Sequence, residues 1–403
     1  MAHLAQDSLA TIYFELTWKS FHATHVERYL AVDVSFTRDI LPLGVKSRMR
    51  GLGPGDSVEM ALDPSEVPPF KPGKVLDMPR SRFQPPVVDG NVIWPRLGRY
   101  YPKHFIENVP GTRPDSDTPF RVVETDKAGF KADLNHPMAG REVTIRATVV
   151  DVRPPIENAG NMHRWPDQFF KGAGMQARQP ETPTDFLGSD PFVRQDEAGD
   201  DEFYAKPRMD DHLDSQAVEN VRKVYGELLE DGMDVLDLMA GHVSHLPDGF
   251  VPGSVTGLGL NDAEMQANPA LTSRMVHNLN EEPALPFGEA SFDAVICTAS
   301  VEYLTKPFEI FEDVARVLRP GGVFVLTFSN QWFASKTISI WTELYEFERM
   351  GLVSQFFMRS EKYEDIWTSS ERGWPRLEGE NEGDSDESAE SDPIFAVWGR
   401  RVG

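Results

Sequence analysis

Stretches of helical periodicity alternate with short apolar stretches between residues 215 and 330, and this alternation limits the fold more than any other feature. In SQAVENVRKVYGELLE at 215–230 the valines recur at the spacing of one helical face, whereas MDVLDLM at 233–239 is a short apolar run. The predicted elements are a helix at 215–230, strands at 233–239 and 254–260, a helix, a strand at 292–300, a helix at 307–318, a turn at 319–322 and a strand at 323–330. Strands that alternate with helices form a parallel, doubly wound sheet, so this half of the chain is predicted to be an α/β domain.

The length and charge of the chain limit its organisation and its partners. A chain of 403 residues exceeds one typical core and predicts two domains of about 150 to 200 residues each. Lys and Arg number 40 against 64 acidic residues, which gives a formal net charge of -24. Because nucleic acid and anionic membrane surfaces repel such a chain, we expect no nucleic acid and no membrane among its partners.

Cysteine and histidine usage indicates neither a disulfide nor a metal site. Cys297 is the one cysteine, and His22, His25, His104 and His136 are too scattered to suggest shared ligands. The opening MAHLAQDSLATIYFELTW lacks the basic start and unbroken apolar core of a signal peptide. No apolar run approaches the roughly 18 residues of a membrane span. We therefore expect a cytoplasmic protein without a metal.

The first part of the chain is predicted to be β-rich. VERYLAVDVSFTRDI and REVTIRATVVDV alternate apolar and polar residues as strands do, whereas the region after residue 64 is crowded with prolines and aromatic residues. The final PIFAVWGRRV is strand-like and is expected to return to the second sheet. The predicted organisation is a first domain at 1–155 with an insertion around 64–120, a flexible linker at 156–200, and a second domain at 201–403 in which the acidic stretch 378–392 is a disordered loop.

The apolar run that ends at Asp237 is followed by a turn that has only one glycine, Gly241. In open α/β sheets ligands bind at the carboxyl ends of the strands, and Asp237 falls there. LPFGEASFDAV and VLRPGG within 285–330, together with VLDL before the turn, resemble class I S-adenosylmethionine-dependent methyltransferases of the methyltransferase type 11 group. The resemblance covers about 201–403 and implies a Rossmann-like domain with a mostly parallel seven-stranded sheet and S-adenosyl-L-methionine as cofactor.

This resemblance also implies which residues bind the cofactor. Asp237 is expected to accept hydrogen bonds from the ammonium group, and Gly259 occupies the place where the family has an acid for the ribose hydroxyls. Met239, Gly241 and Val243 replace the family's three glycines, and FYAKPRMDDHLDSQA at 203–217 would form a lid. The predicted cofactor-binding residues are Asp237, Met239, Gly241, His242, Gly259, Leu260, Asn261, Asn278, Leu279, Ser300 and Val301.

No residue is singled out as the catalytic base. Tyr204, His212, Glu302 and Tyr303 are the candidates, because two lie in the predicted lid and two follow the predicted strand at 292–300. The alternatives are a solvated arm for the lid residues, including Arg208, and plain packing for Tyr303. Asp237 could likewise be a strand-end acid without a ligand, and His245 a residue of the loop.

The first domain resembles the FK506-binding type of peptidyl-prolyl isomerase in its SlyD-like form. GLGPGDSVEMALDPSEV and DLNHPMAGREVTIRATVVDV carry the resemblance, and the insertion at 64–120 stands where that family has a flap that binds unfolded chains. The resemblance implies a β-rich α+β domain. Because the expected tyrosine and the acid-Ser-Pro start are missing, a binding module is favoured over an efficient isomerase, with Phe36, Asp39 and Trp94 as candidates for a remnant site.

The sequence therefore predicts a methyltransferase that modifies an unknown acceptor, either a small molecule or a protein. The first domain would bind unfolded or proline-containing peptide. A second hypothesis is a chaperone-like or isomerase protein in which the methyltransferase half is a degenerate scaffold. In a third, the protein methylates a small molecule and the first domain contributes only stability.

Overall fold

The computed structural model describes residues 3–5, 7–88, 91–109, 113, 117–155, 161–188, 190–209, 212–377 and 390–403. The chain divides into two compact units. Unit 1 consists of Met1–Pro191 and Glu343–Gly351, and unit 2 consists of Phe192–Thr342 and Leu352–Gly403. The chain thus enters unit 1 twice.

Unit 1 contains an antiparallel sheet in the order β2-β1-β10-β3. Alternate residues of β1, among them Ile12, Phe14 and Leu16, are fully buried, which is the period expected of a strand with one face on a core. The elements are β1 (Leu9–Lys19), β2 (Thr24–Ser35), α1 (Leu43–Met49), β3 (Ser57–Ala61), β10 (Val143–Arg153) and α2 (Trp165–Phe169).

A second antiparallel sheet of unit 1 has the order β4-β9-β8-β7 and its own apolar core around Phe83, Phe120 and Phe130. Its elements run from 72 to 133, past the end of the insertion predicted around 64–120. They are η1 (Pro72–Lys74), β4 (Val75–Pro79), η2 (Arg80–Arg82), β7 (Tyr100–Pro102), η3 (Lys103–Phe105), β8 (Pro119–Thr125) and β9 (Gly129–Asp133). Between η2 and β7 the strands β5 (Val87–Val88) and β6 (Asn91–Val92) form a separate two-stranded sheet.

Much of the segment expected to be a flexible linker is packed in unit 1. Phe169 and Phe170 are buried, and Trp165 Nε1 donates a 3.0 Å hydrogen bond to Asp39 Oδ2. Asp39 also accepts hydrogen bonds from the backbone of Ser35 and His163. A few large apolar side chains anchor this segment, although its polar, proline-rich composition suggests a linker.

Phe36, Asp39 and Trp94, the candidates for a remnant isomerase site, all lie in unit 1. Phe36 and Asp39 are buried after β2, and Arg38 pairs with Asp39 at 2.6 Å. These hydrogen bonds and the Arg38 guanidinium lower the pKa of Asp39 to about 2, against the burial that raises it. Trp94 follows β6, is 40% exposed and lies under the Arg80 guanidinium. Asp39 holds the chain after residue 162 in place.

Unit 2 contains seven strands in the order β13-β12-β11-β14-β15-β17-β16. The first five are parallel, and β17 pairs antiparallel with both β15 and β16. The strands are β11 (Asp234–Leu238), β12 (Ser254–Gly259), β13 (Ser273–Val276), β14 (Phe292–Thr298), β15 (Leu318–Phe328), β16 (Tyr363–Arg372) and β17 (Ile394–Arg401). This is the mostly parallel, seven-stranded arrangement that the sequence predicts.

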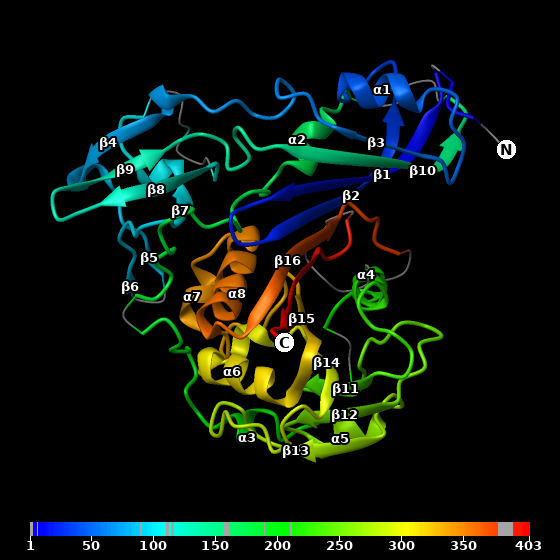
Figure 1. Cartoon of the computed structure of the whole chain (residues 1–403). Helices are drawn as coiled ribbons and strands as arrows, with labels where there is room; N and C mark the ends of the chain where they lie inside the picture. The colour runs from blue at the N-terminus through cyan, green and yellow to red at the C-terminus, as the bar shows by residue number, and fades with distance from the viewer. Residues whose placement is uncertain are drawn as a thin grey trace. The chain divides into compact units, whose positions relative to one another are not determined.

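Helices cover both faces of this sheet (Figure 1). Side chains of α4 pack with Val323 and Val325 of β15, while Phe311 of α6 lies 4.9 Å from Phe324, which points to the opposite face. The helices of unit 2 are α3 (Asp200–Phe203), α4 (Ser215–Gly226), α5 (Asp262–Ala267), η4 (Val301–Tyr303), α6 (Pro307–Val317) and α7 (Ser339–Thr342). The helix α8 (Glu346–Ser360) begins in unit 1 and continues into unit 2 after Gly351. The doubly wound prediction for this part of the chain is therefore confirmed.

The predicted acidic loop at 378–392 falls outside the described residues as far as 389. Its last residues are ordered, which corrects the prediction there. Ser391 and Asp392 are buried, and both donate 2.7 Å hydrogen bonds to the carboxylate of Asp214, the N-cap of α4. These contacts fix the start of β17 against α4.

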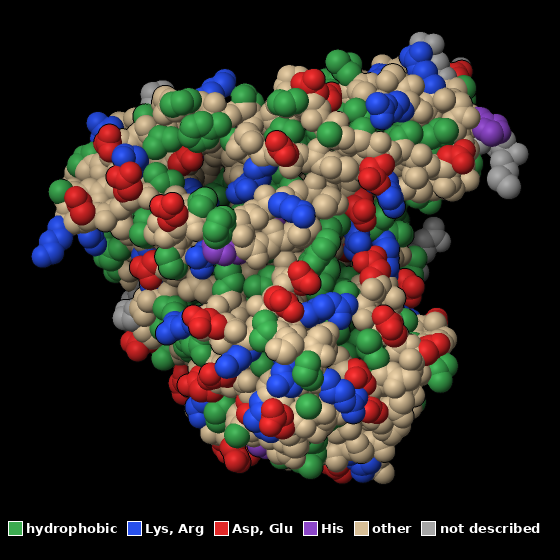
Figure 2. Space-filling view, in the orientation of Figure 1, with side chains coloured by type: hydrophobic (Ala, Val, Ile, Leu, Met, Phe, Trp, Pro, Cys, Tyr) green, Lys and Arg blue, Asp and Glu red, His purple; other side chains and the backbone are tan. Residues whose placement is uncertain are grey.

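Charged side chains of both signs are interspersed over the face in Figure 2. Mixed charge of this kind gives no continuous single-sign surface on that face. Among the helices that the structure describes, none is both long and apolar enough to cross a membrane.

Candidate functional site

A cleft lies at the carboxyl ends of the parallel strands of unit 2, where the strand order reverses between β11 and β14. Chain connections leave β11 and β14 toward opposite edges of the sheet, so the loops after them separate. Seven predicted cofactor-binding residues line this cleft: Asp237, Met239, Gly241, His242, Leu260, Asn261 and Ser300. The structure therefore brings together side chains from three different strand ends.

Asp237 is the buried acid of the cleft, with 3% of its surface exposed. Burial raises its pKa to about 7, although a hydrogen bond from Ser244 acts in the opposite direction. Its Oδ2 atom is buried, and no donor among the described residues reaches it. A buried acceptor without a partner is costly, so this oxygen is suited to a donor that arrives with a ligand.

In the loop after β11, residues other than glycine adopt the left-handed backbone conformation that glycine favours. Met239 has φ of 62° and His245 has φ of 50°, both in the left-handed region that glycine adopts most easily. A β-carbon on Gly241 would lie 3.7 Å from Glu264 Oε2, an ordinary contact, so this glycine is not required by space. The sharp turn is therefore preserved at the cost of strain at Met239, of order 1 kcal/mol.

The end of β12 is too crowded for a side chain at Gly259. A β-carbon there would clash with the Ala240 carbonyl oxygen. Asn261, two residues later, caps α5 by accepting hydrogen bonds from Ala263 N and Glu264 N. The backbone of the β11 loop thus fills the place where the sequence resemblance puts a ribose-binding acid.

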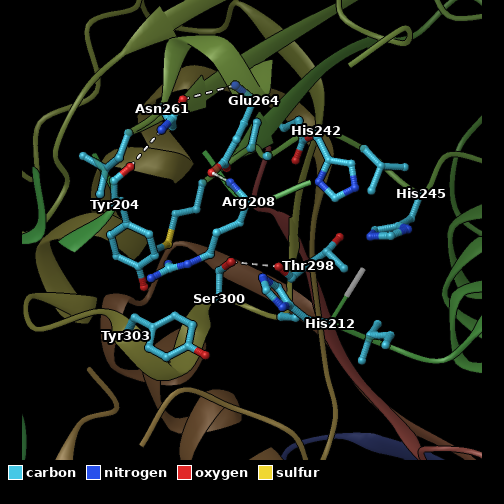
Figure 3. A pocket seen from close by; sticks show the side chains of 18 of the residues that line it. Tyr204, Arg208, His212, His242, His245, Asn261, Glu264, Thr298, Ser300 and Tyr303 are labelled. Atoms are coloured by element: carbon cyan, nitrogen blue, oxygen red, sulfur yellow. Dashed lines mark hydrogen bonds between the residues drawn. The ribbon is translucent and has the colours of Figure 1, made fainter. Parts of the chain in front are cut away.

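Residues from 203–209, together with His212 and Leu213, cover one side of the cleft. Tyr204, Arg208 and His212 line it, as Figure 3 shows. The Arg208 guanidinium lies 4.5 Å from the Phe203 ring and 4.9 Å from the Phe333 ring. Arg208 Nη1 is buried, and none of the described residues accepts a hydrogen bond from it. This cation is therefore held by aromatic rings with one donor still available.

The candidate catalytic residues do not all reach the cleft. Tyr204, His212 and Tyr303 line it, and burial raises the pKa of both tyrosines. The Tyr303 hydroxyl accepts a 2.9 Å hydrogen bond from Phe333 N, so this side chain is positioned by the loop after β15. Glu302 is buried outside the lining residues.

Four predicted cofactor-binding residues lie outside the lining of the cleft: Gly259, Asn278, Leu279 and Val301. Asn278 Nδ2 donates a 3.1 Å hydrogen bond to Asp201 of α3, whereas Leu279 and Val301 are buried. The Asn278 side chain thus connects the loop after β13 to α3.

Among the lining residues that the sequence predictions missed are Glu264, Thr298, Ala299 and Phe333. Thr298 hydrogen-bonds the Tyr225 hydroxyl at 2.6 Å, and Ala299 has φ of 45°. Phe333 lies far along the chain from the other loops, in a stretch without periodicity. Glu264 could have been noticed in the sequence, because it follows Asn261 by three residues, which is the spacing of a capping box at the start of a helix.

The strand order and the position of this cleft are those of a Rossmann-like α/β domain. Residues 240–326 match the family described as methyltransferase domain. That family and fold imply S-adenosylmethionine as cofactor, and the unpaired oxygen of Asp237 fits its ammonium group.

Several similar proteins are described as methyltransferases. The chain is 32% identical over 128 residues to a fatty-acid O-methyltransferase of Mycolicibacterium smegmatis, covering 29% of this chain and 44% of that protein. It is 28% identical over 102 residues to an uncharacterised methyltransferase of Mycolicibacterium vanbaalenii, covering 24% and 40%. The chain therefore spans less than half the length of these curated relatives. An S-adenosylmethionine-dependent methyltransferase structure from Mesorhizobium loti is 16% identical, with a TM-score of 0.30, over 46% of this chain and 98% of that one.

Proposed function

We propose that this protein transfers a methyl group from S-adenosylmethionine to an acceptor bound in the cleft of unit 2. The observation that carries the proposal is the buried Asp237 Oδ2, which faces the cleft at the switch point of the sheet without a partner. An ammonium group would supply both the missing donor and the opposite charge. Pairing with that group would also favour the ionised form of Asp237.

The residues of the cleft would mainly bind and orient. When bound, the cofactor supplies a methyl group on a positively charged sulfur, so little acid or base chemistry is required of the protein. Asp237 would fix the amino acid part of the cofactor, and Tyr303 and Phe333 would form a wall on the acceptor side. Alignment of the acceptor with the methyl group is then the principal contribution of the chain.

We propose further that the acceptor is a carboxylic acid. Arg208 places a half-buried guanidinium in the cleft whose buried Nη1 has no acceptor among the described residues, and a carboxylate is a suitable partner for it. One relative is described as a fatty-acid O-methyltransferase, which supports the same class of acceptor. A carboxylate is already ionised at neutral pH, so it needs no general base.

For unit 1 we propose a SlyD-like module that binds unfolded or proline-containing peptide. The β5-β6 hairpin and the residues near it expose Phe70, Val87, Val92 and Trp94, and Val87 pairs directly with Val92 across the hairpin. Exposed apolar side chains of this kind suit an extended apolar chain. Binding of unfolded protein without any cofactor binding would instead favour the alternative, a chaperone-like protein with a degenerate methyltransferase scaffold.

The test is a calorimetric titration of the full chain with S-adenosylmethionine, repeated with Asp237→Ala. We expect binding by the wild type and a loss of at least about a hundredfold in the variant, because a charge-assisted contact is removed. Asp234→Asn is the matched control, since Asp234 lies at the opposite end of β11 and pairs with Arg319. Equal affinity of Asp237→Ala and wild type would remove Asp237 from the site.

Labelled methyl transfer to a fatty acid but not to its amide would support the acid acceptor.

A further inference from the structure

The cofactor carries a ribose with two neighbouring hydroxyl groups, and the end of β12 offers no side chain to receive them. The Ala240 carbonyl excludes any side chain at Gly259. A Gly259→Asp change could not restore an acid there without moving the β11 loop. An acceptor for the ribose hydroxyls must therefore come from another element.

Asn261 is fully committed to other contacts. Its Oδ1 accepts hydrogen bonds from two backbone amides at the start of α5. Its Nδ2 donates to the carbonyl oxygens of Tyr204 and Ala205, at 2.8 and 3.3 Å. An asparagine with both ends of its amide in use has little capacity left for a ligand.

Glu264 is the acid of α5 that faces the cleft. The spacing from Asn261 is that of a capping box, in which the glutamate would turn back to the N-cap backbone. Here Glu264 Oε1 instead accepts a 2.7 Å hydrogen bond from Arg208 N (Figure 3). Its Oε2 lies 3.7 Å from the position of a β-carbon on Gly241 and receives no hydrogen bond from the described residues.

We propose that Glu264 binds the ribose hydroxyls of the cofactor and replaces the acid that is absent at Gly259. The inference rests on the proposed methyltransferase function. The carboxylate stands beside the loop that the cofactor must approach, and Oε2 can accept hydrogen bonds while Oε1 holds the Arg208 backbone. The same side chain thus connects the ribose to the segment that covers the cleft.

The experiment measures calorimetric affinities of the full chain for S-adenosylhomocysteine and for its 2′-deoxy analogue. Wild type should bind the deoxy analogue about tenfold or more weakly, because a charge-assisted hydrogen bond is lost. Glu264→Gln should bind S-adenosylhomocysteine weakly and discriminate the two ligands much less. Glutamine still offers an oxygen to Arg208 N, so the covering segment keeps its contact.

The matched control is Asp262→Asn on the same helix, where Asp262 is exposed and pairs with Arg274. This variant should bind both ligands as wild type does. Undiminished discrimination in Glu264→Gln would overturn the inference while leaving the proposed function intact. Failure of wild type to bind either ligand would overturn the proposed function, and this inference with it.

Discussion

Asp237 combines a cost to stability with the role in cofactor binding that we propose for it. Its carboxyl is buried in the cleft, and this burial raises its pKa from 3.8 to about 7. The position of this acid was evident from the sequence, because an apolar strand that ends in an acid marks a strand end of an α/β sheet. The left-handed backbone of Met239 was not, since nothing in its side chain suggests φ above zero.

We predict that Asp237→Asn stabilises the protein without ligand at pH above 7. Between the unfolded and folded pKa values the native state retains a proton that the unfolded state has released, so the free energy of unfolding of the wild type falls as pH rises from about 4 to about 7. Asparagine removes this dependence. Urea unfolding of both proteins at a series of pH values from about 4 to above 7 checks it, and the same pH slope in wild type and variant would contradict it.

At the level of elements, the sequence indicated the strands and helices from 215 to 330 because each presents one clear period. It did not indicate α8. Residues 347–354 of that helix are all buried, including Glu348 and Arg349, so no apolar stripe appears. The predicted turn at 319–322 lies within β15, where Gly321 has φ of 78° and the register with β14 shifts. The glycines of this stretch indicated an irregular backbone, but they could not indicate that the residues on both sides of it pair with β14.

Asn261 joins two elements, and its two functions can be separated by substitution. Asn261→Ala should lower the free energy of unfolding by about 1 to 2 kcal/mol, because the cap of α5 is lost. Asn261→Asp keeps the cap acceptor but loses the donor to the Tyr204 and Ala205 carbonyls. We expect the aspartate variant to be nearly as stable as wild type.

Residues 203–209, which cover one side of the cleft, should nevertheless be held less tightly in Asn261→Asp. Hydrogen exchange of the amides at 203–209 measures this release, and it should be faster in both variants than in wild type. Amides of α4 are the internal control and should be unchanged. Slow exchange at 203–209 in the aspartate variant would show that the Asn261 side chain does not hold this segment.

For the whole molecule, the path of the chain differs from a simple succession of two domains. The sequence predicted a change of domain near residue 200, but Glu343–Gly351 belongs to unit 1 although its neighbours belong to unit 2. Composition cannot reveal such a return, because it depends on contacts between distant residues. Arg99 Nε and Glu348 Oε1, 249 positions apart, lie 2.9 Å from each other with both side chains buried.

This buried pair gives the last prediction. Arg99→Met should lower the free energy of unfolding by about 3 to 5 kcal/mol, because Glu348 would remain buried without its cation. The double variant Arg99→Met, Glu348→Leu should recover most of that loss, since no charge is left unpaired. Thermal and urea unfolding of the full chain measure both effects. A double variant no more stable than Arg99→Met would mean that packing of the arginine, and not the charge on Glu348, sets the cost.

Because a fragment of 201–403 lacks Arg99, it carries the same unpaired acid, so we expect it to be less stable than the corresponding part of the full chain.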